Sequence, residues 1–468
     1  MEKNWAGFQK KMSEMATAFL GKENWALIYN YDSDGISSGA IIALTIQRRG
    51  TKFQTLALKQ LYPEHAEQIK SMGKNFFFAD FGSGQLDFLK KEFGENFFVL
   101  DHHQPLPIEH AWHCNPFLFG FDGGSEISAS GMAYFFSTAV DLKNRDLASL
   151  AIVGAVGDMQ DETGRLIGLN SKIVSDGEAA GVLKKKEGLR LYGRISRPLV
   201  QFLMFCTAPY LPELTGNELN CIRFLESLGI ELKQNERWIS FEMLSLSGQK
   251  KLVSALVMHL SRHNVSEYKI QELFGELYSR IQEEPFSPLS DAKEMGTLLN
   301  ACGRWGKADV GLAVCMGDRE EALSTAMSLL VEHRRKLRAG IQWVTEHGTQ
   351  SRETFYFFDA EKNIDDSIVG IVAGMLYGGG TIGFDKPIIA LSRYPSGEIK
   401  VSGRATRDLV QRGLNLGKAF HELCAEMGEG NEGGGHKIAA GAKVPEKNRE
   451  LFLELLDEKI KEQLAKVY

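Results

Sequence analysis

The sequence lacks several features that would place it in a specialised class of protein. Only six of its 468 residues are cysteines, they are widely scattered, and no two form a CxxC pair. This spacing argues against a disulfide scaffold and a zinc ribbon and favours a reducing compartment. The formal net charge of −6 excludes a uniformly basic nucleic-acid coat, although a locally basic groove stays compatible with it.

Long apolar segments are also missing. The first 20 residues have no apolar core of the kind that secretory signals carry. No apolar run approaches the roughly 18 residues that a helix needs to cross a bilayer. We therefore expect a cytoplasmic enzyme or binding protein with no membrane partner. The hydrophobic content of 43% is enough to fill the cores of several domains, of roughly 100–200 residues each.

The first 160 residues alternate short apolar runs with helical stretches. The runs lie at 25–31, 53–58, 75–81 and 96–100. Their nearly continuous apolar character is typical of strands that are buried on both faces of a parallel sheet. Helical segments fit between them at 37–49, 64–71 and 86–93. The alternation predicts an α/β fold with a doubly wound parallel sheet, in which ligands gather beyond the carboxyl ends of the strands.

The rest of the chain has other patterns. Residues from about 199 to 290 look helical, and 318–346 reads as one long helix or two. Strand-like segments follow at 354–358, 387–392 and 398–402, and an amphipathic helix covers 447–466. We expect an N-terminal α/β domain, a helical middle insertion, connecting helices and a C-terminal α/β domain, at 1–198, 199–290, 291–346 and 347–468.

A basic stretch lies between Leu183 and Pro198, where six lysines and arginines face one acidic residue. Two interpretations stay open. The stretch is either a solvated helix or linker face, or a surface that tracks phosphates.

Carboxylates and histidines follow the predicted strands of the N-terminal domain. They are Asp32 and Asp34, then Asp80, then Asp101 with His102 and His103, and finally Asp158 after the apolar run 151–156. If the strands are parallel neighbours, these side chains collect at one edge of the sheet. Clustered carboxylates repel one another, and a divalent cation relieves the repulsion. Oxygen and imidazole ligands suit Mn²⁺, with Mg²⁺ as the alternative. Taken singly, a D-x-D pair or a strand-end Asp is more often a turn or a helix N-cap, and a double histidine is compatible with a structural role.

The series DxDG, a strand-end Asp, DHH and a later GD resembles the four motifs of the DHH phosphoesterase superfamily. The resemblance implies a two-metal centre that hydrolyses phosphate esters or anhydrides. It implies that Asp32 holds one metal and Asp34 the other, that Asp80 bridges them, and that His102 and Asp158 complete the second site.

The same resemblance implies roles for the two remaining motif residues. Asp101 would orient the histidines, and His103 would lie near the scissile phosphate as an acid or a charge stabiliser. The sequence departs from the family pattern at Asn30 and Ile28, where many relatives carry a histidine. This departure leaves the number of bound metals open.

The segment GGGH at 433–436, together with the upstream Ser-Gly-Arg at 402–404, resembles the signature of the DHHA1 domain. Without that context, a glycine triplet is equally a mobile loop. The resemblance implies an active-site cleft between the two lobes, in which the C-terminal lobe binds substrate phosphates. The implied contacts are Ser402, Arg404, Gly434, Gly435 and His436.

Residues 299–304 look like the NAAGR-type segment of RecJ single-strand exonucleases. The wider stretch 290–318 is similar to archaeal RecJ-like proteins, including the GINS-associated nuclease group. The resemblance implies that Asn300 and Arg304 contact the nucleic-acid backbone, where a guanidinium suits bidentate phosphate binding. It also implies that the insertion contacts a replication partner of GINS type.

Together these resemblances imply an exonuclease that uses two Mn²⁺ ions to hydrolyse single-stranded DNA, or RNA, with 5′→3′ polarity in replication or repair. Two alternatives stay open. One is a DHH–DHHA1 phosphodiesterase that acts on oligoribonucleotides or cyclic dinucleotides. The other is a replication scaffold with a vestigial site.

Overall fold

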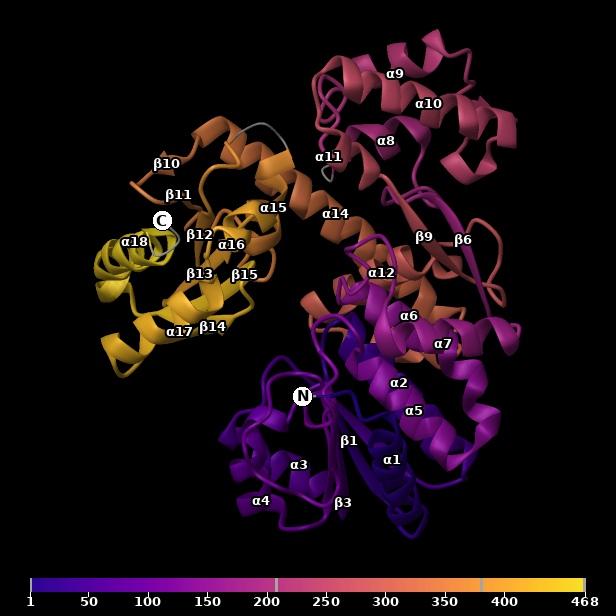
Figure 1. Cartoon of the computed structure of the whole chain (residues 1–468), viewed down its shortest axis with the longest axis vertical. Coiled ribbons are helices and arrows are strands. Elements are labelled where there is room, and N and C mark those ends of the chain that lie inside the picture. Colours follow the sequence, from indigo (N-terminus) through magenta and orange to yellow (C-terminus); the bar gives the residue numbers. More distant parts are fainter. Residues whose placement is uncertain (1, 207–208, 379–381, 466–468) are drawn as a thin grey trace. The chain divides into compact units, whose positions relative to one another are not determined.

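A computed structural model describes residues 2–206, 209–378 and 382–465 (Figure 1). The chain divides into two compact units. The first consists of Met1–Phe202 and Ile222–Leu330, and the second of Leu203–Cys221 and Val331–Tyr468. The four-segment division expected from the sequence stays a prediction.

A five-stranded parallel sheet forms the centre of the first unit. Its strands are β1 (Trp25–Asn30), β2 (Phe53–Leu58), β3 (Asn75–Ala79), β4 (Phe97–Leu100) and β5 (His113–Cys114). Their order is β2-β1-β3-β4-β5, and every neighbouring pair is parallel. The predicted doubly wound sheet is therefore confirmed. The short strand β5 was not expected, because its two residues carry no apolar pattern.

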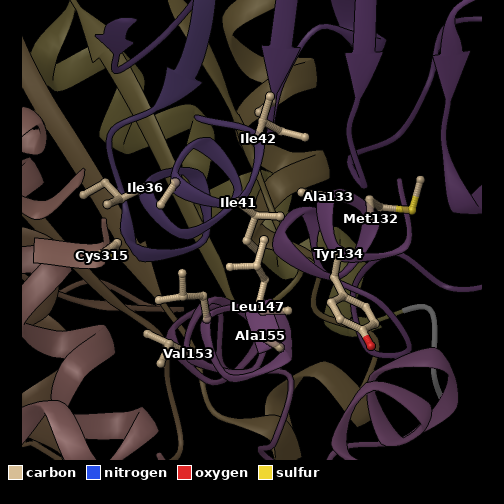
Figure 2. Close-up of a cluster of buried hydrophobic side chains, with 14 of the residues drawn as sticks. Ile36, Ile41, Ile42, Met132, Ala133, Tyr134, Leu147, Val153, Ala155 and Cys315 are labelled. Carbon is tan, nitrogen blue, oxygen red and sulfur yellow. The ribbon is translucent and has the colours of Figure 1, made fainter. Parts of the chain in front are cut away.

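Helices cover both faces of this sheet, which explains the nearly continuous apolar strands. Trp25, Leu27 and Tyr29 of β1 pack on one side, in the core that α1 (Trp5–Leu20), α2 (Ser33–Arg48) and α5 (Ala129–Val140) complete. Ala26 and Ile28 point to the other side, toward α3 (Ala66–Met72) and α4 (Leu86–Phe93). Figure 2 shows part of the larger core, where side chains of α2 and α5 meet those of α6 (Ala148–Gly157).

The apolar run before Asp158 is a helix and not a strand. It forms α6, and Asp158 is the C-cap residue of that helix. The strand interpretation was wrong because α6 is buried on almost all sides, and periodicity alone cannot separate such a helix from a buried strand. Helix α2 also begins earlier than expected, at Ser33, so that Asp32 is its N-cap.

The remaining elements of the first unit are mainly helical. Helices are α7 (Gly168–Ala179), α8 (Leu199–Met204), α9 (Glu218–Ser227), α10 (Leu246–Arg262), α11 (Glu267–Gln271), α12 (Ala292–Arg304), α13 (Ala308–Cys315) and the single long α14 (Glu321–His347). Of these, α8 and α14 begin in the first unit and end in the second, whereas α9 begins in the second and ends in the first. Antiparallel strands are β6 (Leu183–Leu189) with β9 (Phe274–Arg280), and β7 (Lys233–Gln234) with β8 (Arg237–Trp238). Short 3₁₀ turns are η1 (Pro63–His65), η2 (Ser83–Gln85), η3 (Pro116–Phe119), η4 (Leu142–Leu147), η5 (Phe241–Met243) and η6 (Pro288–Ser290).

The basic stretch of the sequence forms β6 and the loop after it. Its charges are largely paired within the first unit. The pairs are Lys185–Glu276, Lys186–Glu242, Arg190–Asp161, Arg194–Glu242 and Arg194–Asp291. Pairing on this scale favours a structural role for the stretch over a phosphate-tracking surface.

The second unit contains a mixed six-stranded sheet, as the strand-like segments after residue 348 predict. Its strands are β10 (Gln350–Ser351), β11 (Tyr356–Asp359), β12 (Ile388–Arg393), β13 (Ile399–Arg404), β14 (Glu432–Gly435) and β15 (Ala439–Val444), in the order β10-β11-β12-β13-β15-β14. Only β11 and β12 pair in parallel among these described strands. The other elements are α15 (Val369–Gly378), α16 (Arg407–Gln411), α17 (Leu416–Met427), η7 (Glu446–Asn448) and α18 (Arg449–Ala465).

Two cores hold this sheet. Helices α17 and α18 pack on one face, against Ile389, Leu391 and Val401. Helix α15 packs on the other face, against Ile388 and Ala390. Across the described parts of the chain, no helix has the length and apolar character that spanning a membrane requires.

Candidate metal centre

The first two carboxylates are fixed by helix ends. Asp32 caps α2, because its Oδ1 accepts a hydrogen bond from the Gly35 N–H at 2.9 Å. Asp34 lies in the first turn of α2, and its two oxygens accept the N–H groups of Ala129 and Ser130 at 2.7 and 3.0 Å. These are the first residues of α5, so the positive end of that helix faces the Asp34 carboxylate. The side chain of Asp34 is therefore held in one orientation before any ligand binds.

Asp80 follows β3 in an unusual conformation. Its φ is +67°, a left-handed value that is uncommon outside glycine. Its side chain is only 2% exposed, and among the described residues Oδ1 has no hydrogen-bond partner. A buried carboxylate oxygen without a hydrogen bond is costly, and strained residues of this kind cluster at functional sites.

His102 stands between the carboxylates. Its Nδ1–H donates to the carbonyl oxygen of Gly123 at 2.6 Å, which leaves Nε2 as the atom that faces the acids. Nε2 lies 3.3 Å from Oδ1 of Asp80 and 3.8 Å from Oδ2 of Asp34. A histidine whose second ring nitrogen is fixed by a carbonyl is the usual arrangement of a metal ligand.

His103 has a separate partner. Oδ1 of Asp101 accepts both the backbone N–H and the Nδ1–H of His103, at 3.1 and 2.7 Å. Oδ2 of Asp101 accepts the N–H of Ser83 at 2.9 Å. Asp101 thus orients His103 but not His102, whereas the resemblance implied that it orients both. The His103 side chain is 44% exposed.

Asp158 approaches from the end of α6. Its Oδ2 lies 3.9 Å from Nδ1 of His102 and accepts a hydrogen bond from Nε2 of Gln160 at 3.0 Å. One third of its side chain is exposed. Gln160 and Gly123 were missed by the sequence reasoning, because no spacing or residue type marks an amide or a main-chain carbonyl as a support of the site.

The electrostatics of the cluster favour a bound cation. Burial, together with the neighbouring Asp32, raises the pKa of Asp80 well above its usual value, and burial also raises the pKa of Asp32. Burial raises the pKa of Asp158 to about 7. Burial opposes a charge on His102, yet the adjacent Asp80 and Asp158 raise its pKa. The charged forms of these carboxylates are therefore disfavoured, and a divalent cation would relieve that cost.

Two overlapping groups of side chains have ligand atoms that lie within 4.8 Å of one another. One group is Asp34, His102 and Asp158, and the other is Asp80, His102 and His103. Oxygen and imidazole donors fit Mn²⁺ or Mg²⁺. The buried Oδ1 of Asp80, which has only Nε2 of His102 at 3.3 Å for a neighbour in the ion-pair geometry, is the atom that best fits a cation here.

Helix α12 supports the turn that carries the first two carboxylates. Oδ1 of Asn300 accepts the N–H of Ser33 at 3.0 Å. A Cβ on Gly303 would lie 1.7 Å from the carbonyl oxygen of Tyr31, so that only glycine permits this close approach. Arg304 follows at the end of α12, where burial lowers its pKa and Asp32 acts against that effect. The structure therefore places Asn300 and Arg304 beside the metal-ligand turn.

The predicted phosphate contacts of the second unit lie on β13 and β14, which flank β15 in the sheet, and directly after β14. In the β13–β15–β14 register, Ser402 and Gly434 both pair with Gly441. Arg404 ends β13, and its Nη1 donates to the carbonyl oxygen of Gly403 at 2.8 Å. Gly435 has a φ of +139°, and the exposed His436 donates its N–H to Ala439 at 2.8 Å. The structure thus gathers these residues at one end of the sheet.

Comparisons with known proteins agree with this arrangement. The parallel α/β unit with its carboxylate–histidine cluster, followed by the mixed-sheet unit, defines the class of DHH–DHHA1 proteins. Family models match the chain twice, as a DHH-CID domain at residues 191–274 and as a DHHA1 domain at residues 353–462. An uncharacterized protein of Methanocaldococcus jannaschii is 33% identical over 451 residues, which are 94% of each chain. The chain belongs to the DHH–DHHA1 family and is RecJ-like.

Solved structures share the fold at low sequence identity. RecJ from Thermus thermophilus in complex with Mn²⁺ is 16% identical with a TM-score of 0.60, and the match covers 97% of this chain and 55% of that protein. An exonuclease RecJ bound to manganese is 15% identical with a TM-score of 0.57, over 98% of this chain and 95% of that one. CDC45 from Entamoeba histolytica is 13% identical with a TM-score of 0.66, over 97% and 99% of the chains. The chain thus spans about half the length of the Thermus protein.

Proposed function

We propose that this protein is a metal-dependent exonuclease that hydrolyses the phosphodiester bonds of single-stranded DNA, or of RNA. The observation that carries the proposal is the convergence of Asp34, Asp80, His102 and Asp158, which come from four distant segments. A structural role alone does not account for it, because buried carboxylates close together destabilise a fold that holds no cation.

Two Mn²⁺ ions, or Mg²⁺, would be held by Asp32, Asp34, Asp80, His102 and Asp158. The ions would supply charge neutralisation for the phosphoryl oxygens and acidify the attacking water. The protein contributes a preformed ligand set, since helix ends and carbonyls already hold Asp34 and His102 in place.

His103 would act on the substrate. Burial opposes its charge, but Asp101 raises its pKa to about 9, so that the imidazole carries a proton at neutral pH. With Nδ1 committed to Asp101, the proton on Nε2 can stabilise negative charge on the phosphate or pass to the leaving oxygen. Asp101 would be the residue that keeps this proton correctly placed.

Basic and polar side chains would bind the strand itself. Asn300 and Arg304 lie beside the proposed metal ligands. Oδ1 of Asn300 accepts the N–H of Ser33, and its Nδ2 would donate a hydrogen bond to a phosphate. The second unit would add the contacts Ser402, Arg404, Gly434, Gly435 and His436. We further propose 5′→3′ digestion, a role in replication or repair in the cytoplasm, and a partner of GINS type bound by the insertion at 199–290, within which the DHH-CID match lies in large part.

An end-labelled strand assay tests this function. Purified protein is incubated with a long 5′-labelled single strand, the matching duplex and a dinucleotide, in Mn²⁺, in Mg²⁺ and in EDTA. We expect metal-dependent release of nucleotides from the single strand by the wild type and none by Asp34→Ala. Cleavage of the dinucleotide alone would identify a small-substrate phosphodiesterase.

The similarity in fold and length to CDC45 supports the alternative of a replication scaffold with a vestigial site. Absence of cleavage by a protein that nonetheless binds Mn²⁺ would favour that alternative. The exonuclease proposal would be rejected by either of these results.

A further inference from the structure

Gln160 is a buried amide that hydrogen-bonds to Asp158 of the candidate metal centre. It lies in the loop after α6, two residues beyond Asp158, and is 4% exposed. Its Nε2 donates to Oδ2 of Asp158 at 3.0 Å and to the carbonyl oxygen of Gly123 at 2.9 Å. Its Oε1 accepts the Nδ2 of Asn170 at 2.6 Å. Both ends of the amide are therefore used.

The Gly123 carbonyl joins this amide to the second ligand. The same oxygen accepts Nδ1–H of His102 at 2.6 Å. The Gln160 NH₂ group has three oxygen acceptors, the third being the carbonyl of Ile127 at 3.4 Å, and the donor at the other end of the amide is the NH₂ of Asn170. These partners fix which way the amide points. One side chain thus connects Asp158, which follows α6, with His102, which follows β4.

We propose that Gln160 is a positioning residue of the metal centre, which sets the geometry of Asp158 and His102 together. The proposal deepens the proposed function and rests on its metal centre. Without Gln160, the Asp158 carboxylate loses a donor, and the Gly123 carbonyl loses one of the two donors that fix it. His102 then turns more freely. Holding its Nε2 toward Asp34 and Asp80 therefore costs more conformational entropy.

Supports of this kind have a measurable effect on metal affinity. Loss of a residue that orients a ligand typically weakens metal binding or activity by roughly 10- to 100-fold. Gln160→Met keeps the length and volume of the side chain but removes both hydrogen-bonding ends. Asn170→Ala leaves Gln160 in place and removes the bond that holds its amide, so we expect a smaller effect in the same direction.

A matched control exists in the same unit. Asn144 is likewise a buried amide, 2% exposed, which donates to the Ser137 carbonyl at 3.0 Å and accepts from Arg48 at 2.7 Å. Ser137 lies in the last turn of α5, whereas Asp34 is bound at the first turn of that helix. Asn144→Leu therefore removes a buried amide of the same kind without touching the metal ligands.

The test measures Mn²⁺ binding to the metal-free full-length protein, by the electron paramagnetic resonance signal of free Mn²⁺ and by calorimetry. We expect the dissociation constant to rise by about 10- to 100-fold in Gln160→Met, by less in Asn170→Ala, and to stay within twofold of the wild type in Asn144→Leu. Melting temperatures in EDTA report whether each variant is folded. If Gln160→Met does not fold, Asn170→Ala decides the question.

Two results would overturn the role of Gln160 and leave the proposed function standing. One is wild-type Mn²⁺ affinity in folded Gln160→Met. The other is an equal loss of affinity in Asn144→Leu, which would trace the effect to general destabilisation. A wild type that binds no Mn²⁺ would instead overturn the metal centre and the proposed function with it.

Discussion

Asp158→Asn should stabilise the metal-free protein at alkaline pH although it removes a proposed metal ligand. Burial raises the pKa of Asp158 from 3.8 to about 7. Between these values the folded protein holds a proton that the unfolded chain has lost, so the stability of the metal-free protein falls as the pH rises. Asparagine is neutral throughout and does not contribute this slope.

The magnitude follows from the shift. A rise from 3.8 to about 7 corresponds to about 4 kcal/mol lost at pH 8 once the carboxyl is ionised. Because one third of the side chain is exposed, screening by water reduces this to about 2 kcal/mol. For a unit of this size we expect the Asp158→Asn melting temperature in EDTA to exceed that of the wild type by about 4 °C at pH 8.

The assay is thermal unfolding followed by circular dichroism in EDTA at pH 5 and pH 8. At pH 5 the difference in melting temperature should be only about a third of that at pH 8, because the loss of stability accrues between the unfolded pKa of 3.8 and the folded pKa of about 7. Adding Mn²⁺ at pH 8 should reverse the order, since only the wild type keeps its full ligand set. Asp87→Asn removes one exposed carboxylate from α4 and serves as the control. An Asp158→Asn protein that is less stable than the wild type at pH 8 in EDTA would refute the reasoning.

Three further predictions concern other parts of the first unit. Gly303→Ala should lower the free energy of unfolding, measured in urea, by roughly 1–3 kcal/mol, because the new Cβ would lie 1.7 Å from a backbone carbonyl oxygen. The control Gly84→Ala should change the urea midpoint little, because its Cβ would meet no atom within 4 Å. Burial lowers the pKa of His113 to about 4, so its folded form stays neutral while the unfolded chain takes up a proton below about pH 6.5. Stability is then lost as the pH falls, by about 2–3 kcal/mol at pH 4.5, and His113→Gln should abolish this part of the slope in urea titrations. Asp101→Asn should lower kcat by roughly 10- to 100-fold with an unchanged Mn²⁺ dissociation constant, because it alters the proton of His103; a lost Mn²⁺ affinity would contradict that assignment.

The sequence predicts the sheet well because its signal is local. Each strand from β1 to β4 is a short apolar run, and the polar residues after these runs mark the edge where ligands gather. The same logic misassigned the run before Asp158, since a helix that is buried on all sides has no polar face to reveal its period. Asp158 nevertheless reaches the cluster, because the carboxyl end of α6 lies near that edge of the sheet.

The supports of the site could not be found in this way. Gln160, Gly123 and Ser83 act through one amide, one carbonyl and one backbone N–H. Every residue has such backbone groups, and glutamine is common on protein surfaces, so residue type carries no signal. Only the folded chain shows which of these groups face a ligand.

The contact between α5 and Asp34 has a consequence for the proposed binding of a phosphate chain. The amino terminus of a helix is a ready receptor for phosphate, but here the Ala129 and Ser130 amides already receive the molecule's own carboxylate. That receptor is closed to an incoming anion. In the proposed nuclease, binding of the sugar–phosphate chain would therefore come from guanidinium groups and glycine amides elsewhere, and its strength would depend on the ionic strength of the medium.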